Sequence, residues 1–168
     1  MRVLATAGHV DHGKSTLIEA LTGSHPDRLA EERRRGLTIE LGHAWTRLPS
    51  GERLAFVDVP GHERFVTTML AGAGPAPAAL FVVAADGGWM PQSAEHLAAL
   101  HGLGVRHGVL AVSRSDLADP APAMARASAE LRATTLGDVE AVAVSATTGA
   151  GLDRLRDALG RLAARLPD

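Results

Sequence analysis

The sequence contains no cysteine, which excludes a disulfide framework and catalysis by a thiol. It also has no long apolar run, since stretches such as 78–85 fall far short of the roughly 20 residues that a membrane-spanning helix needs. The apolar N-terminus leads into a glycine-rich motif and lacks a small-residue cleavage site, so it does not read as a signal peptide. These absences predict a cytoplasmic protein that does not bind membranes.

Lysine is nearly as scarce, because only Lys14 among the 17 Lys and Arg residues is a lysine. A compact ammonium and a forked guanidinium are not interchangeable at a tight phosphate site, so this one lysine is informative. The net charge of −2 at pH 7 argues against a general nucleic-acid binder. A length of 168 residues with 46% apolar residues predicts one globular domain, which we expect to be a monomer.

Short apolar runs alternate with helical patterns, which predicts an α/β fold around a mostly parallel sheet. The last helix has the clearest pattern, because leucines recur every three or four residues from Leu152 to Leu166. Residues 24–36 are polar and lack sustained periodicity, so we expect a long mobile loop there. Strands are expected at 2–7, 41–48, 53–59, 78–85, 108–112 and 140–144, with a hairpin turn at 49–52, and helices near 15–21, 63–71, 93–103, 121–134 and 152–166.

Residues 8–15 read GHVDHGKS and match the phosphate-loop pattern G-x-x-x-x-G-K-[ST] in full. The match lies between a predicted strand and a predicted helix, which is the context that the pattern requires. Its glycines let backbone N–H groups point into one concavity that suits phosphate oxygens, and the helix adds the positive end of its dipole. We therefore expect Lys14 to reach the β- and γ-phosphates and the Ser15 hydroxyl to bind Mg²⁺.

A second motif, Asp58-Val59-Pro60-Gly61, follows an apolar strand downstream of the phosphate loop. Asp58 at a strand end is well placed to hold Mg²⁺ through water. Gly61 can offer its backbone N–H to the γ-phosphate. The two motifs together predict a nucleoside triphosphate hydrolase or switch.

The phosphate loop with its internal His-Val-Asp-His resembles that of translational GTPases, and so do residues 58–65 and 83–92. Residues 35–39 look like the first switch of the same group. Within the group, residues 27–32 and 35–42 and the sequence Val-Pro-Gly-His-Glu-Arg-Phe resemble the selenocysteine-specific elongation factors. The resemblance covers essentially the whole chain. It implies a Ras-like P-loop G domain, with six strands, one of them antiparallel at the edge, and about five helices.

The resemblance also implies roles for single residues. His62 corresponds to the histidine that orients the attacking water, and Thr38 completes the Mg²⁺ shell and senses the γ-phosphate. Val10 and Leu37 match an apolar gate beside that histidine, and Asp11 matches a residue implicated in binding a monovalent cation. The other histidines have no metal-ligand spacing: His9, His12, His25, His43, His96, His101 and His107.

The guanine-binding motif departs from the family pattern, since Ser113-Arg114-Ser115-Asp116 replaces N-K-x-D. Asp116 keeps the carboxylate that accepts from guanine N1–H and the 2-amino group, a pair that adenine does not present. Ser113 is shorter than asparagine, so we expect it to lose the amide bridge to the phosphate loop and the base. Arg114 can lie along the base as lysine does. The expected nucleotide contacts are Asp11, His12, Gly13, Lys14, Ser15, Thr16, Ser113, Arg114, Asp116, Ser145, Ala146 and Thr147, with the Ala146 N–H facing the base oxygen.

The expected reaction is in-line attack of water on the γ-phosphate, with His62, Lys14, Thr38 and Gly61 as the catalytic group. The sequence shows no arginine finger in cis, so hydrolysis is expected to be slow alone and stimulated by the ribosome. The chain ends just after its last helix. Residues 1–168 are therefore expected to be a single GTP-binding domain, truncated or a fragment, without the family's tRNA- and mRNA-binding domains.

Two alternatives remain open from the sequence. The chain could be the G domain of another translational GTPase, similar to elongation factor Tu or to an initiation factor. It could also be a non-catalytic nucleotide-binding module whose base choice is relaxed by Ser113 and Arg114. For the full-length parent of the favoured reading, the ribosome and selenocysteinyl-tRNA are the expected partners, and this domain alone should bind little RNA.

Overall fold

The structure is a computed structural model, and it describes residues 2–23, 42–58 and 78–167. For Val10, residues 42–44 and Asp58 only the backbone is described. The loop expected at 24–36 and the helix expected at 63–71 lie outside the described residues. The same holds for Leu37, Thr38, Gly61 and His62.

A single six-stranded sheet forms the centre of the domain, in the order β2-β3-β1-β4-β5-β6. Parallel pairs join β1 to β3 and β4, β4 to β5, and β5 to β6, whereas β2 runs antiparallel to β3 at the edge. Each strand lies within one residue of its predicted bounds, so the predicted sheet is confirmed. The strands are β1 (Arg2–Gly8), β2 (Gly42–Arg47), β3 (Arg53–Asp58), β4 (Ala78–Ala84), β5 (His107–Ser113) and β6 (Glu140–Ala143).

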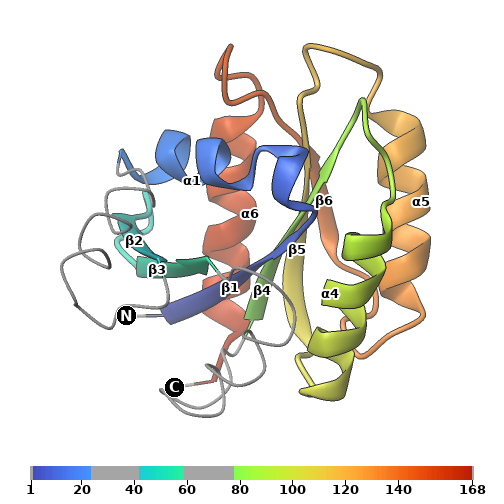
Figure 1. Ribbon diagram of the computed structural model, residues 1–168. Helices are drawn as coiled ribbons and strands as arrows, with labels where there is room; N and C mark the ends of the chain where they lie inside the picture. The colour runs from blue at the N-terminus through green and yellow to red at the C-terminus, as the bar shows by residue number, and fades with distance from the viewer. Residues whose placement is uncertain (1, 24–41, 59–77, 168) are drawn as a thin grey trace, which may run out of the picture.

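Helices cover both faces of this sheet (Figure 1). The helices α1 and α6 lie on one face, and α4 and α5 lie on the other. A short 3-10 turn precedes α1, at the point where the phosphate loop was predicted. The bounds are η1 (Val10–His12), α1 (Lys14–Thr22), α4 (Pro91–Gly102), α5 (Ala121–Arg132) and α6 (Leu152–Arg165).

The core under α1 and α6 is built from leucines that the α6 pattern predicted. Leu155, Leu159 and Leu162 are fully buried, and Leu152 and Leu166 are at most 9% exposed. They pack with side chains of α1, β3 and the central strands. Because burying one such side chain contributes about 1.5–3 kcal/mol, this stripe is a main attachment of α6 to the sheet.

The second core lies under α4 and α5. Phe81 of β4 is buried, and its ring stacks on Trp89 with the ring centroids 5.6 Å apart. Strand β4 is buried along its whole length, since it lies between β1 and β5 with helices on both faces. The two cores pack on opposite faces of the sheet, and β1, β4 and β5 lie side by side between them.

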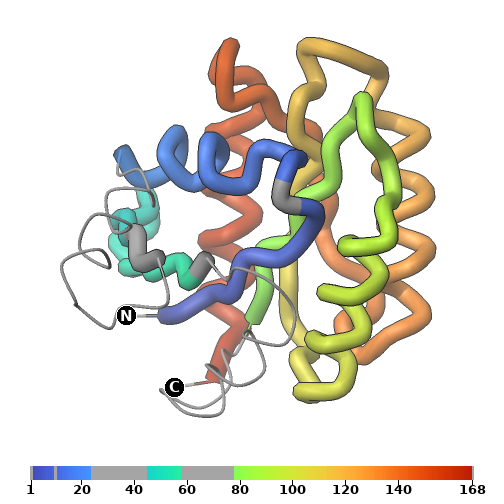
Figure 2. Tube along the Cα trace, viewed as in Figure 1, coloured from blue at the N-terminus to red at the C-terminus, as the bar shows by residue number. Residues whose placement is uncertain are grey.

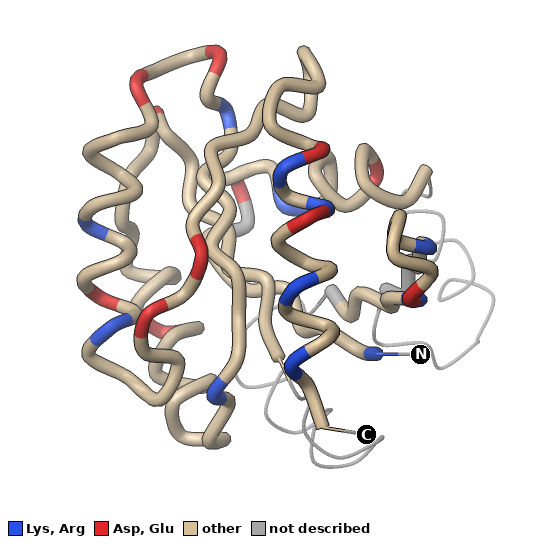
Figure 3. Tube along the Cα trace, turned by 180° about the vertical axis from the view of Figure 1, so that it is seen from behind, with Lys and Arg blue, Asp and Glu red and all other residues tan. Residues whose placement is uncertain are grey.

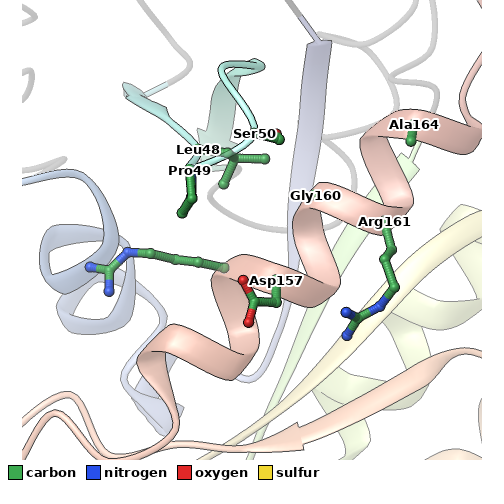
Figure 4. Close-up of a pocket in the computed structure, with 8 residues that line it drawn as sticks. Leu48, Pro49, Ser50, Asp157, Gly160, Arg161 and Ala164 are labelled. Atoms are coloured by element: carbon green, nitrogen blue, oxygen red, sulfur yellow. The ribbon is translucent and has the colours of Figure 1, made fainter.

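The β2–β3 turn packs against α6 and leaves a shallow depression of about 290 Å³ beside it (Figure 4). The turn is closed by the Leu48 N–H, which donates to the Glu52 carbonyl at 2.8 Å. Gly160 of α6 lies beside the turn, and a Cβ there would be in ordinary contact with Ser50 Oγ at 3.8 Å. The depression is lined by Leu48, Pro49, Ser50, Arg156, Asp157, Gly160, Arg161 and Ala164.

Basic and acidic residues are interspersed along α6 (Figure 3). Arg161 donates to both carboxylate oxygens of Glu140 at 2.8 Å, which lowers the pKa of Glu140. Arg156 pairs with Asp153 at 3.1 Å. In the part of the chain that the structure describes, no helix has the length and apolarity that a membrane crossing requires.

Candidate nucleotide-binding site

The predicted nucleotide contacts gather at one edge of the sheet, because the carboxyl ends of parallel strands meet there. Strand β1 leads into the phosphate loop, and β4 leads into residues 85–90. Strand β5 leads into 114–120, and β6 into 144–151. Figure 2 shows these segments together on the upper side of the sheet. The site is thus assembled from four loops that are far apart in the sequence.

Two glycines give the phosphate loop its shape. Gly8 has a φ of 126°, and a Cβ there would lie 2.1 Å from the carbonyl oxygen of Val82 on the neighbouring strand. Gly13 has a φ of 77°, in the left-handed region that favours glycine. Between them the His12 N–H donates to the His9 carbonyl at 3.1 Å and closes the 3-10 turn. The loop predicted from the sequence is present.

Helix α1 begins at Lys14, directly after the loop. Lys14 is 5% exposed, Ser15 is half-buried and Thr16 is exposed. The N-cap residue is Gly13, which has no side chain to compete with a ligand for the first turn of N–H groups. The positive end of the helix dipole therefore faces the loop, which suits a phosphate group.

His12 packs its ring against β4 and serves the loop as an internal brace. The side chain is 3% exposed, and its Nδ1 accepts a hydrogen bond of 3.0 Å from the Ala84 N–H. Burial lowers the pKa of His12 to about 4, with further lowering from His9 and Arg114. The imidazole is therefore neutral at physiological pH, as an Nδ1 acceptor must be. The side chain of His12, a residue expected to contact the nucleotide, thus has a structural role.

Ser113 ends β5 and binds the phosphate loop. Its hydroxyl donates to the His12 carbonyl at 2.7 Å, and the side chain is buried. The amide of an asparagine is missing here, but the Ser113 hydroxyl makes a bridge to the phosphate loop in its place. The end of β5 lies close enough to the loop for a hydroxyl to span the gap. The bridge from this position to the base stays untested.

Arg114 lies along the outside of the phosphate loop. Its guanidinium donates to the Asp11 carbonyl, and Nη1 lies 3.6 Å from Oδ1 of Asp86. A Cβ added to Gly13 would lie 3.9 Å from its Nε. The structure thus shows Arg114 in contact with the phosphate loop, whereas its contact with the base remains a prediction.

The two predicted base loops lie side by side. The Ser115 N–H donates to the Val144 carbonyl at 3.0 Å, which joins 113–116 to the end of β6. Asp116 is exposed, as is required of a group that must meet a ligand. Ser145 is buried and its Oγ accepts from the Thr148 N–H at 3.1 Å, so its hydroxyl shapes the loop. Ala146 is half-buried and Thr147 is exposed beside it.

The predicted Mg²⁺ ligands are only partly described. Asp58 ends β3 opposite Thr6 of β1, so its backbone lies at the same sheet edge as the phosphate loop. Among the described residues, no group of three or more His, Cys, Asp or Glu could hold a metal ion. The side chain of Asp11, predicted to bind a monovalent cation, is exposed.

Two residues contribute to the site without a role predicted from the sequence. His96 of α4 is buried, and its Nδ1 accepts from the Gly8 N–H at 2.9 Å, at the start of the phosphate loop. Asp86 faces Arg114 from the loop after β4. An acid just after a buried strand was the available signal for Asp86. His96 had none, because 88 residues separate it from its partner.

The sequence matches the elongation factor Tu GTP-binding domain family over residues 1–165. This chain belongs to that family. It is a G domain of the translational GTPases, a class whose members bind and hydrolyse GTP, and the Ras-like fold expected from the sequence is confirmed.

Relatives place the chain more finely within the family. It is 45% identical over 163 residues to the selenocysteine-specific elongation factor of Desulfomicrobium baculatum, a match that covers 95% of this chain and 26% of the relative. The match to translation initiation factor 2 subunit gamma of Thermococcus kodakarensis is 36% over 181 residues, covering 93% of this chain and 44% of that protein. Relatives named as selenocysteine-specific factors are thus the better matches, and other translational GTPases are not favoured.

Two solved structures of translation elongation factors have the same fold as this chain. A bacterial selenocysteine-specific elongation factor, EF-Sec, superimposes with a TM-score of 0.78 and 40% identity, covering 99% of this chain and 30% of that one. The elongation factor SelB of Methanococcus maripaludis, solved with the GTP analogue GppNHp, gives a TM-score of 0.74 and 26% identity, covering 99% and 34%. The chain spans about a quarter of the length of the selenocysteine-specific relative, 26% in the Desulfomicrobium match.

Proposed function

We propose that residues 1–168 form the single GTP-binding and GTP-hydrolysing domain of a selenocysteine-specific elongation factor. The observation that carries the proposal is the phosphate loop, which has its full motif and is held through His12 by hydrogen bonds from Ser113 and Ala84. The identity to named selenocysteine-specific factors supports the finer assignment. Asp116, exposed beside the 145–147 loop, supports guanine as the base.

In this proposal the phosphate loop holds the β- and γ-phosphates through its backbone N–H groups and through Lys14. Ser15 and Asp58 hold the magnesium ion, which when bound neutralises charge on the phosphate oxygens. Asp116 accepts from the guanine N1–H and 2-amino groups. The Ala146 N–H donates to the base oxygen. Each of these groups belongs to a loop at the carboxyl edge of the sheet.

Hydrolysis proceeds by in-line attack of water that His62 orients. Thr38 and the Gly61 N–H sense the γ-phosphate, so its loss releases both loops. These three assignments rest on the family resemblance, since the residues lie outside the described part of the chain. We also propose that the reaction is slow until the ribosome stimulates it, since the sequence shows no arginine finger in cis.

For the full-length parent we propose delivery of selenocysteinyl-tRNA to the ribosome in the cytoplasm. The support is the name shared by the relatives, selenocysteine-specific elongation factor. The net charge of −2 supports weak RNA binding by this domain alone, and we propose that the domain is a monomer. A monovalent cation near Asp11 is a further part of the proposal.

Competition binding tests the nucleotide assignment. GTP, GDP and ATP compete with a fluorescent guanine nucleotide in the presence of Mg²⁺, and we expect GTP and GDP to displace it and ATP to fail. Asp116→Asn should lose guanine preference, because its amide N–H meets the N1–H donor of the base. Asp157→Asn, the same change on the exposed side of α6, is the matched control. Equal competition by ATP with the wild-type domain would contradict guanine specificity.

A separate experiment tests His62. In the full-length parent, ribosome-stimulated single-turnover hydrolysis should fall strongly in His62→Ala, while GTP binding stays unchanged. Binding is measured on the same preparation, so that misfolding is distinguished from loss of chemistry. Equal hydrolysis by the variant and the wild type would remove His62 from the mechanism.

A further inference from the structure

The contact between Arg114 and Asp86 joins two of the loops at the nucleotide edge. Arg114 belongs to the base loop after β5, and Asp86 belongs to the turn after β4. The same guanidinium donates to the Asp11 carbonyl in the phosphate loop. We propose that Asp86 is a positioning residue for guanine-nucleotide binding, which holds Arg114 against the phosphate loop so that the phosphate and base loops act as one unit. The inference rests on the proposed nucleotide binding at this site.

The backbone of Arg114 has an unusual conformation. Its φ of 57° makes it the only non-glycine residue with a positive φ among the described residues. Such a conformation is uncommon and persists where surrounding contacts fix it. Ser113 is bonded to His12 just before it, and the Leu117 N–H donates to the Arg114 carbonyl just after it. The site therefore maintains a strained residue whose side chain crosses the phosphate loop.

Asp86 is itself held in place relative to the phosphate loop. The N–H groups of Gly87 and Gly88 donate to the Ala84 carbonyl at 3.3 and 2.9 Å, which closes the turn that carries Asp86. The Ala84 N–H donates in turn to the ring of His12. The contacts thus form a closed circuit from His12 through Ala84 and Asp86 to Arg114 and back to the loop at Asp11.

The chemistry of arginine fits this circuit. A guanidinium has five N–H donors in a planar fork and can bond to a carbonyl and a carboxylate that lie in different directions. Removing Asp86 takes away one of the two partners that fix its orientation. Both side chains of the pair are 38% exposed, so the pair is screened by solvent. Exposed pairs of this kind contribute up to about a fivefold change in an equilibrium.

Release of a fluorescent GDP analogue from the domain, followed after mixing with excess GDP, measures the effect. Asp86→Asn should release the analogue about three- to fivefold faster than the wild type, and the difference should shrink in 1 M salt. Glu95→Gln is the matched control, because it removes one negative charge from an exposed position on α4. It should leave the release rate unchanged.

A double variant separates positioning from a general charge effect. Arg114→Ala should speed release, and adding Asp86→Asn to it should change nothing more, because Asp86 acts through Arg114. Asp86→Glu should retain most of the wild-type behaviour. The melting temperature of the nucleotide-free domain should stay the same in Asp86→Asn, since the pair is exposed.

Three results would overturn the inference. Release from Asp86→Asn could be as slow as or slower than wild type, the two substitutions could act additively, or the nucleotide-free melting temperature could fall enough to explain the faster release. Failure of the proposed function looks different, since the wild-type domain would then not bind the guanine analogue at all.

Discussion

The Ser113 hydroxyl donates to the His12 carbonyl at 2.7 Å, and this one bond attaches the end of β5 to the middle of the phosphate loop. Both residues are buried, at 5% and 3% exposure. Ser113 occupies the first position of the guanine motif, where the N-K-x-D pattern has asparagine. Its hydroxyl therefore provides a link between this position and the phosphate loop.

Ser113→Ala should weaken both the fold and nucleotide binding. The substitution leaves the buried His12 carbonyl without this donor, which costs about 1–3 kcal/mol. Urea denaturation measures the loss in the free energy of unfolding, and titration with GDP measures the loss of affinity. Ser113→Thr keeps the hydroxyl and should stay near the wild type. A stable Ser113→Ala domain with unchanged GDP affinity would show that the bond contributes little.

The stability of the domain should depend on the protonation of His12. Its pKa falls from 6.5 to about 4 in the folded state, so the unfolded chain binds more protons between these values. The contribution of His12 is then fully present above pH 6.5 and is lost as the pH falls toward 4. Protonation of His12 lowers the free energy of unfolding by up to about 3 kcal/mol, given 1.36 kcal/mol for each pKa unit.

The comparison for this effect is His12→Asn, whose side-chain oxygen can accept from Ala84 but does not titrate. Urea midpoints at several pH values between 4 and 7 should fall more steeply for the wild type than for the variant. The other histidines are present in both proteins, so their effect on the pH dependence cancels in the comparison. Parallel curves would mean that His12 titrates normally in the folded domain.

Gly87→Ala should disturb the phosphate loop from the side of β4. A Cβ at position 87 would lie 2.6 Å from Nε2 of His12, which is buried and held by Ala84. Such overpacking costs about 1–3 kcal/mol. Gly102→Ala is the control, because a Cβ there meets nothing within 4 Å. Thermal unfolding should show a lower midpoint for Gly87→Ala alone; equal midpoints would indicate that His12 moves aside freely.

The two glycines of the phosphate loop should differ in their tolerance of alanine. At Gly8 a Cβ would lie 2.1 Å from the Val82 carbonyl, so β1 and β4 must separate. At Gly13 the nearest atom is 3.9 Å away, which leaves only the conformational cost of about 1–2 kcal/mol for a left-handed residue. Circular dichroism and urea denaturation should rank Gly8→Ala as the more destabilised. The opposite order would contradict the described loop.

The sequence predicted what depends on local pattern. The sheet, its hairpin and the leucine stripe from Leu152 to Leu166 follow from apolar periodicity, and the phosphate loop follows from its glycines and its place between strand and helix. The sequence did not predict how the loop is held. The role of the Ser113 hydroxyl depends on the distance between two elements, which no residue pattern encodes.

The roles of the two buried histidines as hydrogen-bond acceptors could not be predicted from the sequence either. Whether an imidazole faces a ligand, a metal or a backbone N–H depends on packing, and His12 and His96 both accept from backbone N–H groups. The opposing charges of Arg114 and Asp86 meet because β4 and β5 are neighbours in the sheet. The assignments of Thr38, Gly61 and His62 remain predictions from resemblance.

The partners of the phosphate loop also have a consequence for the order of folding. Ala84 lies 72 residues from His12 in the chain, and Ser113 lies 101 residues from it. Contacts between such distant residues form slowly, because the entropy of closing the intervening chain must be overcome first. The first strand, loop and helix precede these partners in the chain, and the loop lacks its bond to Ser113 until β5 is in place. We therefore expect full nucleotide affinity only after β5 has joined the sheet beside β4.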